Sequence, residues 1–395
     1  EFRRVLFRSN HFGIKRTTSQ NTKKRNLKLI LLNLLSAWVD DPNLNISVHM
    51  SSAAYNDGTF CSKGRSRYNE LKISGTIIEV VNFLKDAHLI GRKETWLGAG
   101  GKGFVNLIWP TNELIKMFSS YALGASDISY HPDREPIVLL NRSQQTVEYH
   151  DNKRIQKMRL FMQEYNSLLA RTFVDIPSVS RVLRVPTKNL QNTKLNNQIS
   201  ISNRNKFVTR VFVNNRFSGN GVFAGGWWQQ VGIALRQEIR IDDFPTVEID
   251  FSNLYPFLAY AHAGLNFWDS NYTDIYKVRD NHASNKEFFQ DMAKLLFIIS
   301  LDVSNQKTML QNVKTNLGAV GQMKICSDGM LSEIMDDIKQ NASEISHLFC
   351  SGTGLKLCQL ESRIYNYMLA NFIETDTPLL TVNHSVIVQI GRAHV

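Results

Sequence analysis

The segment from Thr246 to Pro256 constrains the fold most strongly, because it changes abruptly from a strand pattern to a helix pattern. Glu248 and Asp250 alternate there with apolar residues. Successive side chains of an extended chain point to opposite faces, so the two carboxylates share one face of a strand. Carboxylates at the end of a strand are ligands for Mg²⁺, which organises nucleotidyl transfer; the alternative is an ordinary solvated strand face.

Both ends of the chain resemble a translated sequencing adapter. Arg4-Val-Leu-Phe-Arg-Ser9 has a possible coding string whose reverse complement, in another frame, encodes Ile390-Gly-Arg-Ala-His-Val395. We therefore expect residues 1–9 and 390–395 to be foreign to the gene, and the chain between them to be truncated.

Composition favours a globular protein with a polyanionic partner. The chain has 395 residues, enough for two or three domains, and a formal charge of +11. Clustered Lys and Arg favour nucleic acid, although a merely basic soluble protein is the alternative. The cysteines lack C-x-x-C spacing, which favours a reducing, cytoplasmic location. The longest apolar run, 27–39, is too short and too mixed to predict a membrane role.

The first part of the chain predicts a winged-helix-like domain. Residues 10–25 are basic and polar and are expected to form an arm before a helix over 26–39. Helical periodicity after Thr76, two strand-like segments at 91–97 and 104–109 and another helix after Thr111 give the helix, hairpin, helix order of that DNA-binding module. We assign residues 26–150 to this domain. Four basic residues are candidates either for phosphate contacts or for solvated loop charges: Arg65, Arg67, Lys93 and Lys102.

A connecting region separates this domain from the rest. Residues 153–169 form an amphipathic helix, and residues 186–206 are rich in Asn, Gln and Lys with few apolar anchors. We therefore interpret 151–205 as a connecting helix and polar linker, and 206–389 as the second domain.

The second domain contains four blocks in a characteristic order. They are Gly225-Gly-Trp-Trp-Gln-Gln230 with Arg236, then Glu248-Ile-Asp250-Phe-Ser, then Lys294 on a helix, then Val382-Asn-His-Ser385 between apolar runs. This order resembles family A DNA polymerases and the single-subunit RNA polymerases. It is also similar to uncharacterised bacterial and mobile-element proteins with G-G-R-F-Y-G-x-W-W-Q and E-L-D-Y-S-x-L-H motifs. The resemblance covers about 206–388 and implies an α+β chain with a right-hand palm and fingers around an antiparallel sheet.

The resemblance also implies roles for single residues. Asp250 would bind both Mg²⁺ ions and the main-chain carbonyl of Phe251 would bind one of them, while Glu248 on the same face is a further candidate acid. Lys294 would hold the triphosphate of the incoming nucleotide; the alternative is a surface lysine beside Asp291.

The last block departs from the family pattern. His384 stands where the family has its second catalytic aspartate, and imidazole is a poor ligand for Mg²⁺. Three explanations remain open: Glu248 supplies the missing charge, the enzyme is inactive, or an error near the end of the fragment altered the codons.

Further candidates come from the stretch where relatives hold the template-primer duplex. Tyr255 stands where the family has a glutamate that excludes ribose. Trp227 and Trp228 either stack on bases or belong to the core. The candidates for contact with nucleic acid are Arg210, Arg216, Gln229, Gln230 and Arg236.

Two hypotheses follow. The first is Mg²⁺-dependent, template-directed nucleotidyl transfer with a DNA or RNA template-primer and nucleoside triphosphates as partners, on an active site that has lost a carboxylate. The second is a DNA-binding replication or maintenance factor of a mobile element that retains the palm scaffold without turnover.

Overall fold

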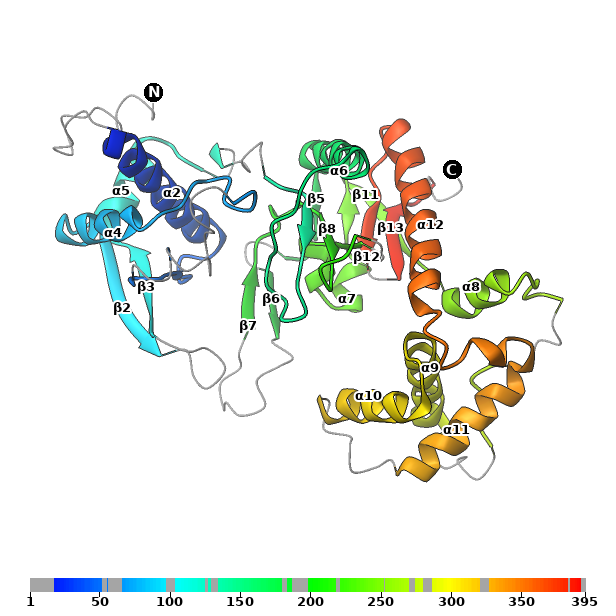
Figure 1. Ribbon diagram of the computed structural model, residues 1–395. Coiled ribbons are helices and arrows are strands. Elements are labelled where there is room, and N and C mark those ends of the chain that lie inside the picture. The colour runs from blue at the N-terminus through cyan, green and yellow to red at the C-terminus, as the bar shows by residue number, and fades with distance from the viewer. Residues whose placement is uncertain are drawn as a thin grey trace.

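The computed structural model describes residues 18–51, 55, 66–96, 104–124, 127–128, 134–179, 183–186, 198–217, 221–251, 253–269, 274–279, 286–319, 327–382 and 384–391. The fold is mixed α+β, with sheets whose strands pair antiparallel except for β4 and β8. Its buried apolar residues form three clusters, which define an N-terminal unit, a central unit and a helical unit (Figure 1). The expected fold class is thus confirmed at the level of α+β with antiparallel sheets.

The N-terminal unit packs helices against a three-stranded sheet of order β1-β3-β2. Leu34, Val81 and Ile108 are fully buried between the helices and the sheet. The strands and the helix after Thr111 lie within a residue of the predicted positions, whereas helix α2 begins at Thr18, so residues 18–25 are helical rather than part of an arm. The elements are α2 (Thr18–Asp40), β1 (Ile46–Val48), α4 (Thr76–Asp86), β2 (Ile90–Trp96), β3 (Phe104–Pro110) and α5 (Asn112–Ser120).

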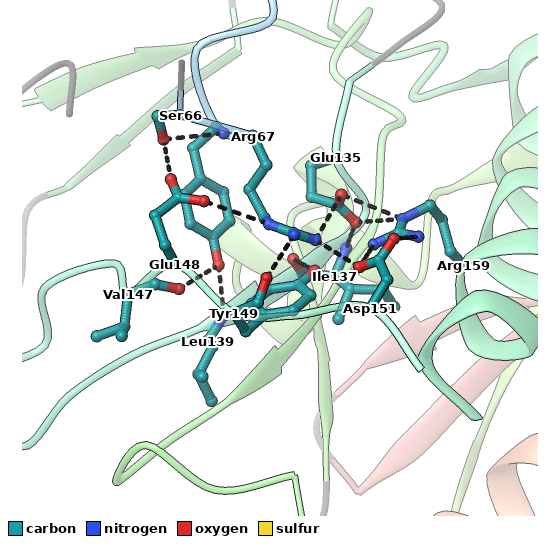
Figure 2. A network of polar contacts seen from close by, with 11 residues as sticks. Ser66, Arg67, Glu135, Ile137, Leu139, Val147, Glu148, Tyr149, Asp151 and Arg159 are labelled. Atoms are coloured by element: carbon teal, nitrogen blue, oxygen red, sulfur yellow. Dashed lines mark hydrogen bonds and ion pairs between the residues drawn. The ribbon is translucent and has the colours of Figure 1, made fainter. Parts of the chain in front are cut away.

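Arg67 joins the N-terminal unit to the segment that leads into the central unit (Figure 2). Its guanidinium lies 3.6 Å from the centroid of the Tyr149 ring and donates to the Tyr149 carbonyl at 2.6 Å. The same group pairs with Asp151 at 2.9 Å and with Glu148 at 3.4 Å. Arg67 is therefore engaged within the protein, which argues against the phosphate contact considered for it; Arg65 and Lys102 lie outside the described residues.

Arg159 completes this network from helix α6 (Lys153–Arg171). It forms two hydrogen bonds with Asp151, at 2.7 and 2.8 Å, and two with Glu135, at 3.0 and 3.1 Å. These bonds from Arg159 lower the pKa of Asp151 to about 2. Arg67 and Arg159 both bind the Asp151 carboxylate at the junction between the N-terminal and central units. Because bidentate ion pairs are directional, these contacts fix the geometry of the junction.

The central unit contains a five-stranded sheet of order β12-β13-β11-β10-β5 and a three-stranded sheet of order β4-β8-β9. Residues 137–176 share its core, so the expected connector belongs to this unit and the boundary lies before 137. Strand β7 also falls inside the expected linker, where it pairs with β6; residues 187–197 lie outside the described residues. The strands are β4 (Ile137–Leu139), β5 (Val174–Asp175), β6 (Leu183–Pro186), β7 (Gln198–Ile201), β8 (Thr209–Phe212), β9 (Val222–Ala224), β10 (Arg240–Ile241), β11 (Phe244–Asp250), β12 (Leu380–Val382) and β13 (Ser385–Gln389).

The helical unit lies in the chain between β11 and the β12–β13 hairpin and has a core of its own. Its last helix, α12, runs from this unit along the central sheet, so the chain returns to the hairpin beside β11 (Figure 1). The helices are α8 (Leu254–His262), α9 (Lys286–Asp302), α10 (Gln306–Ala319), α11 (Asp328–Asn341), the 3₁₀ helix η4 (Ser343–Leu348) and α12 (Gly354–Glu374).

Candidate functional site at the end of strand β11

The end of β11 lies beside the turn between β12 and β13. The antiparallel register places Asp250 opposite Ser385, and the Phe251 N–H donates to the His384 carbonyl at 3.1 Å. Val382 pairs with Ser385, so two residues connect the strands, of which Asn383 lies outside the described residues. The structure thus brings Asp250 and His384 together, as the order of the polymerase-like motifs implied.

His384 is held by a carboxylate that sequence reasoning did not assign to the site. Its Nδ1 lies 3.0 Å from Oε1 of Glu361 on α12, whose side chain is buried. The other carboxylate oxygen of Glu361 accepts the Tyr255 hydroxyl at 3.1 Å. Leu357 and Tyr365, one turn away on either side of Glu361, are also buried, so an acid on an apolar helix face was the signal available in the sequence.

Glu248 is engaged within the sheet. Its Oε2 accepts Arg236 Nε at 2.9 Å, and its Oε1 accepts the Ser385 hydroxyl at 2.6 Å. Arg236 lies at the end of the short helix α7 (Ile233–Arg236) and also donates to the Val231 carbonyl. Arg236 and Glu248, expected as a duplex contact and a metal ligand, instead form a largely buried ion pair.

The side chains and carbonyls at this site do not fit a centre that binds two Mg²⁺ ions. Both oxygens of Glu248 have partners, and the Phe251 carbonyl accepts the Leu254 N–H at 3.1 Å. Position 384 carries an imidazole hydrogen-bonded to Glu361. Within the described part of the chain, no three His, Cys, Asp or Glu side chains are grouped so that they could hold a metal ion. We therefore derive no catalytic step through Mg²⁺ from this arrangement.

Lys294 lies apart from this cluster. It is on α9, in the helical unit, with its side chain 54 % exposed and paired with Asp291 at 3.1 Å. None of the polar contacts found in the described residues connects it to Asp250 or His384. The arrangement matches the alternative of a surface lysine beside Asp291.

The block from 225 to 230 supports the sheet. Trp227 and Trp228, on the 3₁₀ helix η2 (Trp227–Gln230), are both fully buried, and Trp228 Nε1 donates to the Thr381 carbonyl at 2.9 Å. Gln229 Nε2 donates to the same carbonyl at 2.8 Å. Gln230 is exposed. Trp228 and Gln229 therefore hold β12 in place, Trp227 packs against Trp228, and neither indole is available to stack on a base.

A cavity of about 630 Å³ opens beside His384, between α12 and strands β9 and β12. Tyr255 and Arg216 line it, together with Glu361. Arg210 lies behind its wall, 6 % exposed, and donates to Asn366 and Ser362. Burial raises the pKa of Tyr255, and its contacts with Cys358 and Glu361 raise it further, so its hydroxyl remains protonated as a hydrogen-bond donor.

We expect His384 to titrate with a pKa above 6.5, because the hydrogen bond to Glu361 favours the imidazolium more than burial opposes it. A folded-state pKa above the unfolded one stabilises the fold fully below about pH 6.5, and this stabilisation is lost as pH rises through the folded pKa. Glu361→Gln should lower the His384 pKa, measured from its imidazole resonances by NMR. The resonances of His88, on the N-terminal unit, serve as the internal control. A His384 pKa unchanged in Glu361→Gln would contradict this pairing.

None of the helices in the described ranges is both long and apolar enough to span a bilayer. Neither a protein-family model, nor a curated protein, nor a solved structure matches this chain.

Proposed function

We propose that this protein binds nucleic acid through a winged-helix-like N-terminal domain and a polymerase-like palm, without nucleotidyl transfer by the chain as it stands. The N-terminal element order supports the first part: α2, β1, α4, β2 and β3, with sheet order β1-β3-β2, resemble the helix, hairpin and sheet order of a winged helix. Lys85 on α4 and Lys93 on β2 are exposed there. Helix α4, which precedes the hairpin, is the candidate recognition helix.

The juxtaposition of Asp250 with His384 is the observation that carries the palm assignment. In this arrangement a strand ending in an acid pairs with a hairpin, and a helical unit lies between them in the chain. That is the order expected of a palm interrupted by fingers. The carboxylate needed at the turn is replaced by His384, which is hydrogen-bonded to Glu361, so the scaffold supports binding better than turnover.

Binding should depend steeply on salt, because a chain of formal charge +11 displaces counterions from phosphates. For about six phosphate contacts, affinity for a labelled primer-template duplex should fall by about 10³ between about 50 and 200 mM salt. We expect fluorescence anisotropy to show this dependence, and to show that Asp250→Ala leaves binding intact.

A matched pair of variants tests the winged-helix assignment. Lys85→Gln/Lys93→Gln should weaken duplex binding, whereas Lys153→Gln/Lys157→Gln removes the same charge from exposed positions on α6 and should change it little. If both double variants lose the same duplex affinity, the loss reflects net charge alone. Helix α4 would then have no support as the recognition helix. Absence of binding at low salt would overturn the proposed function.

Nucleotidyl transfer is the second candidate, favoured by the carboxylate of Asp250 at the turn. We expect no Mg²⁺-dependent primer extension by the unmodified protein, and extension by His384→Asp that is lost in Asp250→Ala/His384→Asp. DNA or RNA template-primer and nucleoside triphosphates are the partners under this candidate, with the cytoplasm as its compartment. If His384→Asp extends no primer, this candidate is discarded; extension by the unmodified protein that requires Asp250 would instead overturn the non-catalytic assignment.

A further inference from the structure

A cavity of about 320 Å³ lies where the N-terminal and central units meet. Asp40, the last residue of α2, lines it from the N-terminal unit, and Asp175 on β5 lines it from the central unit. Apolar side chains form most of the remaining wall, among them the buried Ile176, Leu183 and Ile201. The cavity therefore combines two carboxylates with an apolar interior.

The Asp175 carboxylate accepts no hydrogen bond from the described residues, and its Oδ1 is buried. Its cross-strand neighbour Arg240 forms no ion pair with it and instead donates to the Asp243 carbonyl at 3.0 Å. Burial and the charge of Asp243 raise the pKa of Asp175, although the charge of Arg240 acts in the opposite direction. A partly buried carboxylate without a donor is unfavourable, so a ligand that brings a donor to Asp175 gains free energy there.

Trp227 supplies a second polar atom without a partner. Its indole belongs to the wall of the same cavity and is fully buried, and its Nε1 is a donor that finds no acceptor in the described ranges. The wall thus contains one unmatched acceptor, on Asp175, and one unmatched donor, on Trp227. Most buried polar groups in native proteins are hydrogen-bonded, so these two atoms point to a molecule in the cavity that pairs with both.

The second carboxylate of the wall is already neutralised. Asp40 pairs with Arg204 at 2.7 Å, and Arg204 also donates to the Ser36 carbonyl and hydroxyl at 3.0 Å. The remaining carboxylate, on Asp175, is too small a ligand set for a metal ion, which favours a ligand with one positive charge. Phe173, a further residue of the wall, is 55 % exposed and so lies where the cavity meets solvent. The apolar wall suits a hydrocarbon or aromatic body on that ligand.

We propose that this cavity binds a small organic cation: a protonated amine on an apolar or aromatic body that also carries a hydrogen-bond acceptor. The ammonium group donates to Asp175, and the acceptor pairs with Nε1 of Trp227. A volume of about 320 Å³ is within the range of small-molecule sites. Neither Asp250 nor His384 lines this cavity, so the site is separate from the cluster at the end of β11 and does not depend on the proposed function.

Tyramine and tyrosol test the proposal by isothermal titration calorimetry on the whole chain at neutral pH. Both carry a phenol hydroxyl, and tyrosol has a second hydroxyl in place of the ammonium group. We expect tyramine to bind and tyrosol to bind at least about tenfold more weakly, as the loss of a charge-assisted hydrogen bond requires. Asp175→Asn keeps the shape of the side chain and removes its charge, so it should abolish the difference between the two ligands.

Asp336→Asn is the control, because it makes the same chemical change at an exposed position on α11 that does not line the cavity. It should leave the affinity for tyramine unchanged. Equal losses in Asp175→Asn and Asp336→Asn, or equal affinities of the unmodified protein for the two ligands, would overturn the proposal. If neither ligand binds, the proposal is also rejected, and an ordered water is then the partner of the two unmatched atoms.

Discussion

Trp228→Ala should lower the free energy of unfolding by about 3–5 kcal/mol, the usual cost of removing a buried tryptophan. The indole is fully buried and donates to the Thr381 carbonyl of β12, and an added Cβ at Gly226 would lie within 2.2 Å of it. The substitution therefore leaves a large cavity under the sheet that carries His384 and removes one of the two hydrogen bonds that the Thr381 carbonyl accepts. Urea unfolding followed by circular dichroism measures the loss.

Trp268→Ala is the matched control, because this side chain is 71 % exposed. It should cost about 1 kcal/mol or less, which covers its ring contacts with Phe257 and Phe267. A Trp228→Ala variant with unchanged stability and weaker binding to single-stranded DNA would instead return Trp228 to the base-stacking role that its position beside two glycines suggested.

Arg236→Met should lower the free energy of unfolding by about 3 kcal/mol at neutral pH, because it leaves the Glu248 carboxylate largely buried without its cation. Burial opposes ionisation of Glu248, but the hydrogen bonds from Arg236 and Ser385 outweigh it and lower the pKa. A lowered pKa stabilises the fold above the unfolded value, about 4.5, and this contribution disappears as pH falls through the folded pKa. The cost of Arg236→Met should therefore be smaller at pH 4 than at pH 7.

The double variant Arg236→Met/Glu248→Leu should recover most of the lost stability, to within about 1 kcal/mol of the unmodified protein, because apolar residues of similar volume replace a buried pair with little loss. Urea unfolding of the unmodified protein, Arg236→Met and the double variant at pH 4 and pH 7 measures these free energies of unfolding. If Arg236→Met costs nothing, the pair is dispensable, and Glu248 returns as a candidate acid at the site.

Local patterns in the sequence predicted much of the secondary structure. Alternation before Asp250, the apolar runs on either side of residues 383–384 and the periodicity after Thr76 correspond to β11, the β12–β13 hairpin and α4. Each pattern extends over one or two elements, and hydrophobic alternation identifies which face of an element is buried. The pairing of β11 with the hairpin did not follow from these patterns; the expectation that Asp250 and His384 lie together came from the resemblance to the polymerase motifs.

Local sequence patterns could not predict which side chains from distant elements contact one another. The strand that carries Asp250, the hairpin that carries His384 and the basic charge of the chain all follow from the amino-acid sequence. The folded chain was needed to show that Glu361 holds His384, that Arg236 neutralises Glu248, that Arg67 joins two units and that Arg210 is buried. Periodicity shows that a side chain is buried, whereas its partner depends on how elements far apart in the chain cross and pack.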